Sequence, residues 1–137
     1  MIKELTIKTR AQGLHDVTAE LAGLIAKSGV EQGLCTVFLQ HTSASLLIQE
    51  NYDSSAKYDL ENWMNRMVPE NDPLYTHTAE GEDDMPAHIK AALTANSIAI
   101  PFISAQLCLG TWQGVFLWEH RHGPHSRKMV VHLSEDK

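Results

Sequence analysis

The 137-residue chain lacks most of the features that mark membrane, secreted or nucleic-acid-binding proteins. It has no apolar run near the ~20 residues that span a bilayer, and its first residues show no signal-peptide pattern. Basic residues are few, eleven against seventeen acidic ones, and the resulting net charge of −6 argues against a nucleic-acid partner and permits a cation site. We therefore expect a cytoplasmic protein with no membrane or nucleic-acid partner.

Cysteine is also scarce, and several common catalytic motifs are absent. The two cysteines, Cys35 and Cys108, lie in apolar, strand-like segments, so we expect buried, reduced thiols; a disulfide is the minor alternative. No Walker-type or dinucleotide-binding glycine pattern occurs. Ser43 and Ser45 lie close to a histidine but lack the Gly-x-Ser-x-Gly elbow that exposes a hydrolase nucleophile.

Hydrophobic residues make up 43% of the chain, which predicts one packed domain over residues 1–137. Alternating or continuous apolar segments predict strands, and 3.6-residue spacing predicts helices. The expected strands are 3–9, 34–40, 46–48, 97–102, 107–119 (two strands around a bend) and 128–133, and the expected helices are about 14–28, 53–68 and 86–95. The last strands follow one another without helices between them. We therefore expect an α+β fold, with a mixed, mainly antiparallel sheet in a sandwich-like two-layer arrangement and about three packed helices.

Residues 107–119 are the most unusual stretch. Gly110 and Gly114 flank a short segment that contains Trp112 and Gln113. Apolar runs lie on both sides of it, which predicts two strands around a tight bend. Glycine is needed where the backbone takes a positive φ or approaches another group closely. Glu119 ends an apolar strand face, so it is either a strand terminus that reaches water or a placed functional acid.

Histidines and acidic residues form a dispersed set in the middle of the chain. His41, Glu50, Asp59, His77 and His88 each lie at a strand end, at the edge of a helix stripe or in a neighbouring loop. Imidazole and carboxylate together suit Zn, Mn or Fe, and they also serve as acid/base pairs. The spacing does not match a compact metalloprotease motif, so surface histidines and helix-capping acids are the alternative explanation.

A second polar group surrounds a Gly-Pro turn near the C-terminus. Arg121, Arg127 and Lys128 are candidates for holding a phosphate or diphosphate, with ordinary surface charge as the competing explanation. Three histidines belong to the same turn, and we interpret them as part of a solvated turn in preference to a metal site: His120, His122 and His125.

Several short motifs occur together between residues 41 and 121. In order they are His-Thr-Ser-Ala-Ser at 41–45, Glu50, Asp59, Tyr-Thr-His at 75–77, Glu-Gly-Glu-Asp-Asp-Met-Pro-Ala-His-Ile-Lys at 80–90, Leu-Gly-Thr-Trp-Gln-Gly at 109–114 and Glu-His-Arg at 119–121. This combination resembles the YjbQ-type family of secondary thiamine-phosphate synthase enzymes. The resemblance covers nearly the whole chain. Gln49 and Asn96 depart from residues that are common in that family, and neither departure removes a candidate catalytic group.

The resemblance implies a compact α/β domain with a sandwich-like sheet, assembled as a homotrimer. It also implies one active site that gathers residues from across the chain. The candidate catalytic residues are His41, Glu50, Asp59, Gln113 and Glu119, with Arg127 for a substrate phosphate and His77 and His88 as metal ligands.

The implied activity is a low thiamine-phosphate synthase activity, in which a pyrimidine methyl diphosphate joins a thiazole phosphate and releases diphosphate. Such a reaction needs a divalent metal (Zn or Mg) or basic groups on the leaving diphosphate. It also needs an acid/base, for which His41 or His77 is the candidate. One alternative is a metal-dependent hydrolase or lyase on another small phosphorylated metabolite. Another is a non-catalytic trimeric module that binds an anion.

Overall fold

The computed structural model describes residues 1–137 and contains three helices and eight strands in two antiparallel sheets, which confirms the α+β class. The elements are β1 (Ile2–Thr9), β2 (Gly13–Asp16), α1 (Thr18–Ser28), β3 (Gly33–Leu39), β4 (Ala44–Glu50), α2 (Ser54–Met67), α3 (Asp84–Leu93), β5 (Ser97–Ile103), β6 (Gln106–Leu107), β7 (Gln113–Glu119) and β8 (His125–Glu135). None of the helices is long and apolar enough to cross a membrane.

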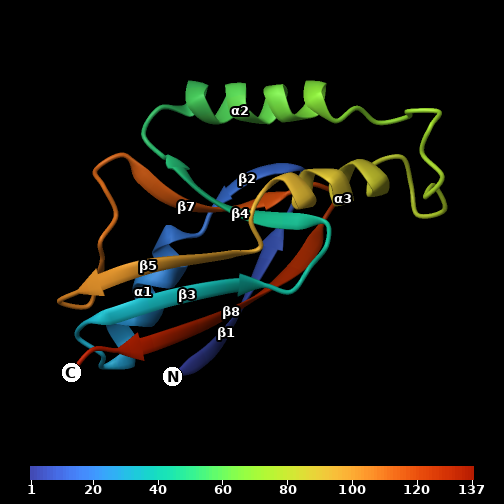
Figure 1. Ribbon diagram of the computed structural model, residues 1–137. Coiled ribbons are helices and arrows are strands. Elements are labelled where there is room, and N and C mark those ends of the chain that lie inside the picture. Colours follow the sequence, from blue (N-terminus) through green and yellow to red (C-terminus); the bar gives the residue numbers. More distant parts are fainter.

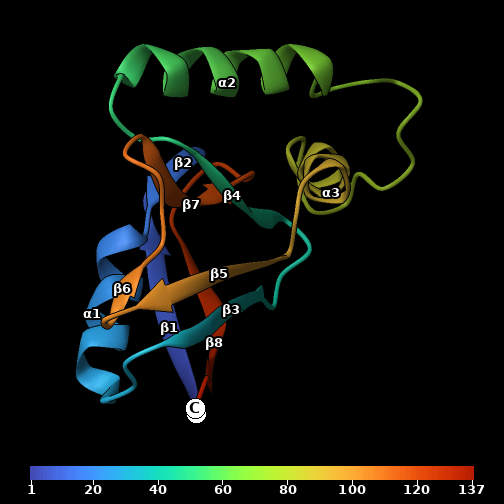
Figure 2. The same ribbon diagram turned by 60° about the vertical axis from the view of Figure 1, so that its left-hand side comes forward.

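The two sheets form layers with α2 outside them (Figures 1 and 2). The five-stranded sheet has the order β1-β8-β3-β5-β6, and the three-stranded sheet has the order β2-β7-β4. The main core lies between the sheets and α1, and includes Leu21, Val37 and Leu117. A smaller apolar cluster, including Met64 and Trp118, joins the other face of the three-stranded sheet to α2. Strand β7 therefore contributes to both clusters, and the five residues from Val115 to Glu119 are all buried.

The first helix begins later than its apolar spacing predicted. Residues 13–16 pair with β7 as strand β2, and α1 begins at Thr18. The backbone amide of Val17 donates to the carbonyl of Val115 at 2.8 Å, and the amide of Val115 donates to the Thr18 hydroxyl at 2.8 Å. These tertiary hydrogen bonds override the local helical pattern. The expected end at Ser28 is confirmed, with Gly29 in the left-handed region at φ 78°.

Strand β3 is covered on one face only. Cys35 and Val37 are fully buried, whereas Leu34 and Phe38 are 39% and 45% exposed. The sequence is apolar on both faces, so burial could not be judged from composition. The outward face of the five-stranded sheet consequently carries exposed apolar side chains among polar ones.

Helix α2 matches its expected bounds, but its apolar stripe is mostly uncovered. The Asp53 carboxylate accepts a hydrogen bond from the amide of Ser55 at 2.9 Å, as a helix-capping residue does. Met64 is buried, whereas Trp63 and Met67 are exposed. Only part of the apolar stripe of α2 is therefore covered in a single chain.

The expectation of a hairpin at 107–119 is wrong. Strand β6 pairs with β5 in the five-stranded sheet, whereas β7 lies between β2 and β4 in the other sheet, so the segment crosses between layers. Neither Gly110 nor Gly114 has a positive φ. Gly114 instead permits the side chain of Asn51 to approach the backbone closely, because a Cβ at position 114 would lie 2.8 Å from the Cβ of Asn51.

The two cysteines differ in environment. Cys35 is buried in the main core, and burial raises the pKa of its thiol to about 11. Cys108 is exposed on the segment between β6 and β7, so the expectation that it is buried is wrong. Both thiols are free.

The close approach at Gly114 yields a test of this chain path. We expect Gly114→Ala to lower the free energy of unfolding by about 1–3 kcal/mol, because the new methyl overpacks against Asn51. Gly110→Ala is the matched control, since its Cβ would meet only the end of the Gln113 side chain, at 3.3 Å. Urea denaturation measures both variants, and equal losses would contradict this account of Gly114.

Candidate functional site

Two histidines and an aspartate converge at the start of α3. The His77 Nε2 lies 2.7 Å from the Oδ2 of Asp84, and the His88 Nε2 lies 3.5 Å from the same oxygen. One ligand atom from each residue lies within 4.8 Å of the other two. Asp84 is buried, His88 is half-buried and His77 is exposed, so the group opens to solvent on one side. We call these three residues the His–Asp–His cluster.

Local helix geometry creates the cluster. Asp84 is the first residue of α3, and His88 follows one turn later, so both side chains lie on one face of the helix. The sequence pattern predicted a helix start at 86, with His88 in the first turn; the helix begins two residues earlier. Sequence reasoning did not select Asp84 as a candidate ligand, although its four-residue separation from His88 was a visible signal.

The cluster fits a divalent metal ion by its donor set. Two imidazole nitrogens and one carboxylate oxygen suit Zn, Mn or Fe better than Mg, which prefers oxygen ligands. The Nδ1 of His88 lies 3.1 Å from the carbonyl oxygen of Thr42, which selects the tautomer with hydrogen on Nδ1. The Nε2 of His88 therefore keeps its lone pair on the side facing Asp84. Outer hydrogen bonds of this kind are typical of metal-binding histidines.

A second polar group lies buried between the two sheets. Arg127 Nε donates to Glu119 Oε1 at 2.8 Å, Arg127 Nη2 bonds the other oxygen, and the Thr9 hydroxyl donates to Oε1 at 2.6 Å. Glu119 and Arg127 are 0% and 4% exposed. Burial alone would raise the pKa of Glu119, but the hydrogen bonds from Arg127 and Thr9 outweigh it and hold that pKa below its usual value. We call Thr9, Glu119 and Arg127 the polar junction.

The polar junction answers the question that the sequence left open about Glu119. Its carboxylate does not reach water, and the Arg127 guanidinium is engaged by Glu119 and by the carbonyl of Ser43, 3.4 Å from Nη2. Both residues thus lie in an internal ion pair that joins β7 to β8. Neither side chain is presented to a surface pocket in this chain.

Residues 41–43 connect the polar junction to the His–Asp–His cluster. His41 Nε2 accepts a hydrogen bond from the Lys128 amide at 2.8 Å, and the neighbouring Thr42 carbonyl contacts His88. Burial and then the charge of Arg127 lower the pKa of His41, so its ring is neutral near pH 7, with the Nε2 lone pair held by the Lys128 amide and the hydrogen on Nδ1. A cavity of about 420 Å³ opens beside His41. Its lining residues are Phe38, Leu39, Gln40, His41, Thr42, Ser43 and Asn96.

His120 does not belong to the solvated turn in which the sequence placed it. It is fully buried, its Nε2 lies 2.8 Å from the Ser45 hydroxyl, and burial lowers its pKa to about 3. The Ser45–His120 contact has the composition of a nucleophile and base, but no substrate can reach two fully buried side chains. His122 is exposed as expected, with its Nε2 2.6 Å from a Glu70 oxygen.

Three of the candidate catalytic residues lie away from this region. Glu50 pairs with Gln113 at one end of the β4–β7 ladder, and Ala44 pairs with Glu119 at the other end. Six strand steps separate the two ends by about 20 Å. Asp59 is exposed on α2. Within one chain, the structure therefore brings His41, His77 and His88 to one region and leaves Glu50, Gln113 and Asp59 outside it.

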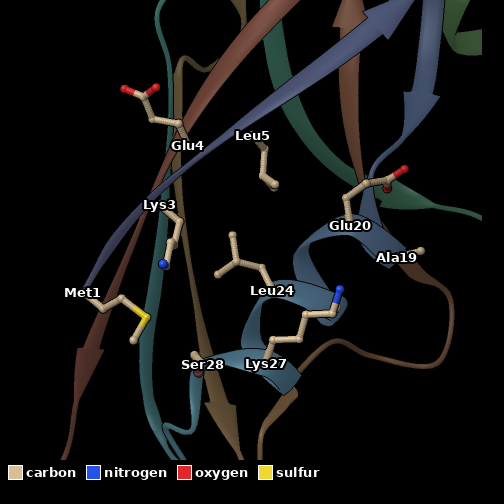
Figure 3. A pocket seen from close by; sticks show the side chains of 10 residues that line it. Met1, Lys3, Glu4, Leu5, Ala19, Glu20, Leu24, Lys27 and Ser28 are labelled. Carbon is tan, nitrogen blue, oxygen red and sulfur yellow. The ribbon is translucent and has the colours of Figure 1, made fainter.

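The largest cavity contains none of the candidate residues. It measures about 550 Å³ and lies between β1 and α1, where Leu5 and Leu24 face each other and Lys3 and Lys27 extend at the rim (Figure 3). Cavity volume therefore does not select the candidate site in this protein. The convergence of ionisable side chains is the criterion that selects it.

Comparison with known proteins gives a consistent set of relatives. A family model described as "UPF0047 protein YjbQ-like" matches residues 3–136. The chain is 52% identical over 130 residues to a UPF0047 protein of Synechocystis sp., covering 95% of this chain and 88% of that protein. It is 41% identical to the UPF0047 protein YjbQ of Escherichia coli O157:H7, covering 96% and 95% of the two chains.

Solved structures agree with this set. A crystal structure of an uncharacterized conserved protein of the YjbQ/UPF0047 family from Clostridium acetobutylicum is similar with a TM-score of 0.87 and 34% identity, covering 96% of this chain and 99% of that one. A conserved hypothetical protein from Thermus thermophilus is similar with a TM-score of 0.86 and 30% identity, covering 96% and 99%.

The buried His120 predicts a pH dependence of stability. Its folded pKa of about 3 lies below the ordinary value of 6.5, so below pH 6.5 the unfolded chain binds a proton that the folded chain does not. The free energy of unfolding should then fall by up to about 1.4 kcal/mol per pH unit on acidification. We expect His120→Gln, which can still bond Ser45, to reduce this slope in urea denaturation between about pH 5 and 7. An unchanged slope would contradict the assignment.

Proposed function

The chain belongs to the UPF0047 family of YjbQ-like proteins, and we propose that it is a metal-dependent enzyme that acts on a small phosphorylated metabolite. The observation that carries this proposal is the His–Asp–His cluster, whose three ligand atoms lie within 4.8 Å of one another and open to solvent beside residues 41–43. Two imidazole nitrogens and one carboxylate oxygen form a donor set of catalytic zinc sites, which keep a further position open for water or substrate.

Each part of the region has a role in this proposal. His77, Asp84 and His88 would hold a divalent ion, preferably Zn, and the ion would supply positive charge to phosphate oxygens. His41, neutral at pH 7 with its hydrogen on Nδ1, donates a hydrogen bond from Nδ1 to a phosphate oxygen of the substrate, which enters the 420 Å³ cavity beside it. Arg127 was predicted to bind the phosphate; since its guanidinium is engaged by Glu119 and Ser43, we assign it to holding residues 41–43.

The resemblance in the sequence favours a thiamine-phosphate synthase type of reaction at this site. In that reaction the C–O bond of a pyrimidine methyl diphosphate breaks, the diphosphate takes the electron pair, and the ring nitrogen of a thiazole phosphate forms the new C–N bond. The reaction needs charge neutralisation at the leaving diphosphate and a pocket that keeps water from the cation. The donor set of the cluster equally suits a hydrolase or lyase on another phosphorylated metabolite.

Metal content and turnover test the proposal together. Untagged protein should bind about one Zn²⁺ per chain, and His77→Ala and His88→Ala should each abolish that binding. Both variants, and His41→Ala, should lower the rate of thiamine phosphate formation, or of phosphate release from a panel of phosphorylated metabolites, by about 10²-fold or more. His15→Ala, on β2, is the control histidine.

The possible outcomes separate the candidate functions. Thiamine phosphate formation supports the synthase, and phosphate release alone supports the hydrolase. A thermal shift with phosphate but no turnover supports the anion-binding module. Stoichiometrically metal-free protein with full activity would rule out the metal-dependent mechanism.

We further propose that the protein assembles as a homotrimer, as the resemblance implies, and that it is cytoplasmic, as the sequence composition led us to expect. The exposed apolar side chains on the outward face of the five-stranded sheet, Leu34 and Phe38, and the exposed side of α2, with Trp63 and Met67, support self-association. Light scattering should give three times the mass of one chain, and Leu34→Lys should shift it towards the monomer. Leu74→Lys, on an exposed loop, is the matched control, and a monomeric wild type would contradict the proposal.

A further inference from the structure

Arg121, one of the sequence's candidates for holding a phosphate, instead connects the acidic loop to the start of α3. Its Nη2 donates to the carbonyl of Glu80 at 2.7 Å and to Asp83 Oδ1 at 3.2 Å, and its Nε lies 3.4 Å from Asp83 Oδ2. Its Nη1 lies 3.4 Å from the Oδ1 of Asp84. The planar guanidinium thus contacts both carboxylates and the loop backbone at once, which an ammonium group could not do.

The Asp84 carboxylate divides its two oxygens between different partners. Oδ1 faces Arg121, whereas Oδ2 faces His77 and His88. Asp84 has no other charged side-chain partner within 4 Å. The guanidinium therefore faces one oxygen of Asp84 at 3.4 Å, while the two imidazoles face the other oxygen.

Arg121 is itself anchored to the interior of the protein. Its backbone amide donates to Glu119 Oε2 at 3.1 Å, and the next amide, that of His122, donates to Asp83 Oδ2 at 2.8 Å. Glu119 belongs to the buried polar junction. A continuous path of hydrogen bonds therefore runs from the core of the sandwich through Arg121 to Asp83, and the ion pair at 3.4 Å links Arg121 to Asp84.

The loop backbone is shaped to admit this contact. Gly81 has a φ of 115°, which side-chain-bearing residues rarely adopt, and a Cβ there would lie 3.2 Å from Asp83 Oδ1 and 3.5 Å from Arg121 Nη2. Glycine thus leaves room for the guanidinium to reach the loop.

We propose that Arg121 is a positioning residue, which orients Asp84 and holds the 80–84 loop so that the His–Asp–His cluster can bind a divalent cation. This inference rests on the proposed function. Arg121 does not touch the cation or the substrate; it acts through the Oδ1 of Asp84 and through Asp83.

Zn²⁺ affinity of the purified protein, measured by competition with a chelator, tests the proposal. Arg121→Ala should weaken Zn²⁺ binding by about 10–100-fold, as loss of an outer-shell partner does. Arg121→Lys keeps the charge without the fork and should lose less. His122→Ala is the matched control, because its side chain lies on the same turn and contacts Glu70 but not Asp84. It should bind Zn²⁺ as the wild type does.

The direction of the change separates positioning from a simple charge effect. Removing a positive charge 3.4 Å from Asp84 would by itself strengthen cation binding. A loss of affinity in Arg121→Ala therefore supports the proposal, and unchanged or tighter binding overturns it. A lower melting temperature with unchanged Zn²⁺ affinity would show a purely structural role and would also overturn it.

Hydrogen exchange of the metal-free protein gives a readout that does not depend on metal binding. The amides of residues 80–84 should exchange faster in Arg121→Ala than in His122→Ala; equal rates would overturn the proposal. If the wild type binds no Zn²⁺, the proposed function fails, and the inference that Arg121 supports cation binding fails too. Faster exchange in Arg121→Ala would then show only that Arg121 holds the loop. Should Arg121→Ala not fold, Arg121→Gln removes the same positive charge and the same fork while keeping most of the side chain, and it carries the same expectations.

Discussion

The buried ion pair between Glu119 and Arg127 is the contact on which the arrangement of the site depends. Glu119 belongs to the three-stranded sheet and Arg127 to the five-stranded sheet, and Thr9 adds a hydrogen bond from β1. Removing one partner of such a pair typically costs about 3–5 kcal/mol, because the other charge is left buried. The same two residues make further hydrogen bonds: Arg127 donates to the carbonyl of Ser43, and Glu119 accepts from the amide of Arg121. The segments that carry His41 and the contacts of Asp84 are therefore both attached to one internal pair.

Much of this molecule follows from patterns that operate over short distances in the sequence. The α+β class and the bounds of α2 were predicted because periodicity is a local property. His77 and His88 were selected as a metal pair, and the structure places them around one carboxylate. That carboxylate, Asp84, was missed because an acidic residue beside several others looks like a solvated loop until the helix start is known.

The features that sequence reasoning missed depend on contacts between distant segments. Residues 107–119 look like a hairpin, but β6 and β7 find partners in different sheets, and no local signal records which sheet a strand joins. Glu50 and Gln113 were grouped with Glu119. Strand register instead places Glu50 and Gln113 together at one end of the β4–β7 ladder and Glu119 at the other end. His120 looked solvated because it borders a Gly-Pro turn, although a bond to Ser45 holds it inside. Register and burial are tertiary properties, and composition does not encode them.

The central claim is that His77, Asp84 and His88 form one metal-binding site beside residues 41–43. A crystal grown with Zn²⁺ and measured at the zinc absorption edge tests it most directly. The account predicts one strong anomalous peak, with the Nε2 atoms of His77 and His88 and an oxygen of Asp84 each about 2.0–2.2 Å from it. A peak at other histidines, or no peak at this cluster in protein shown to be active, would contradict the account.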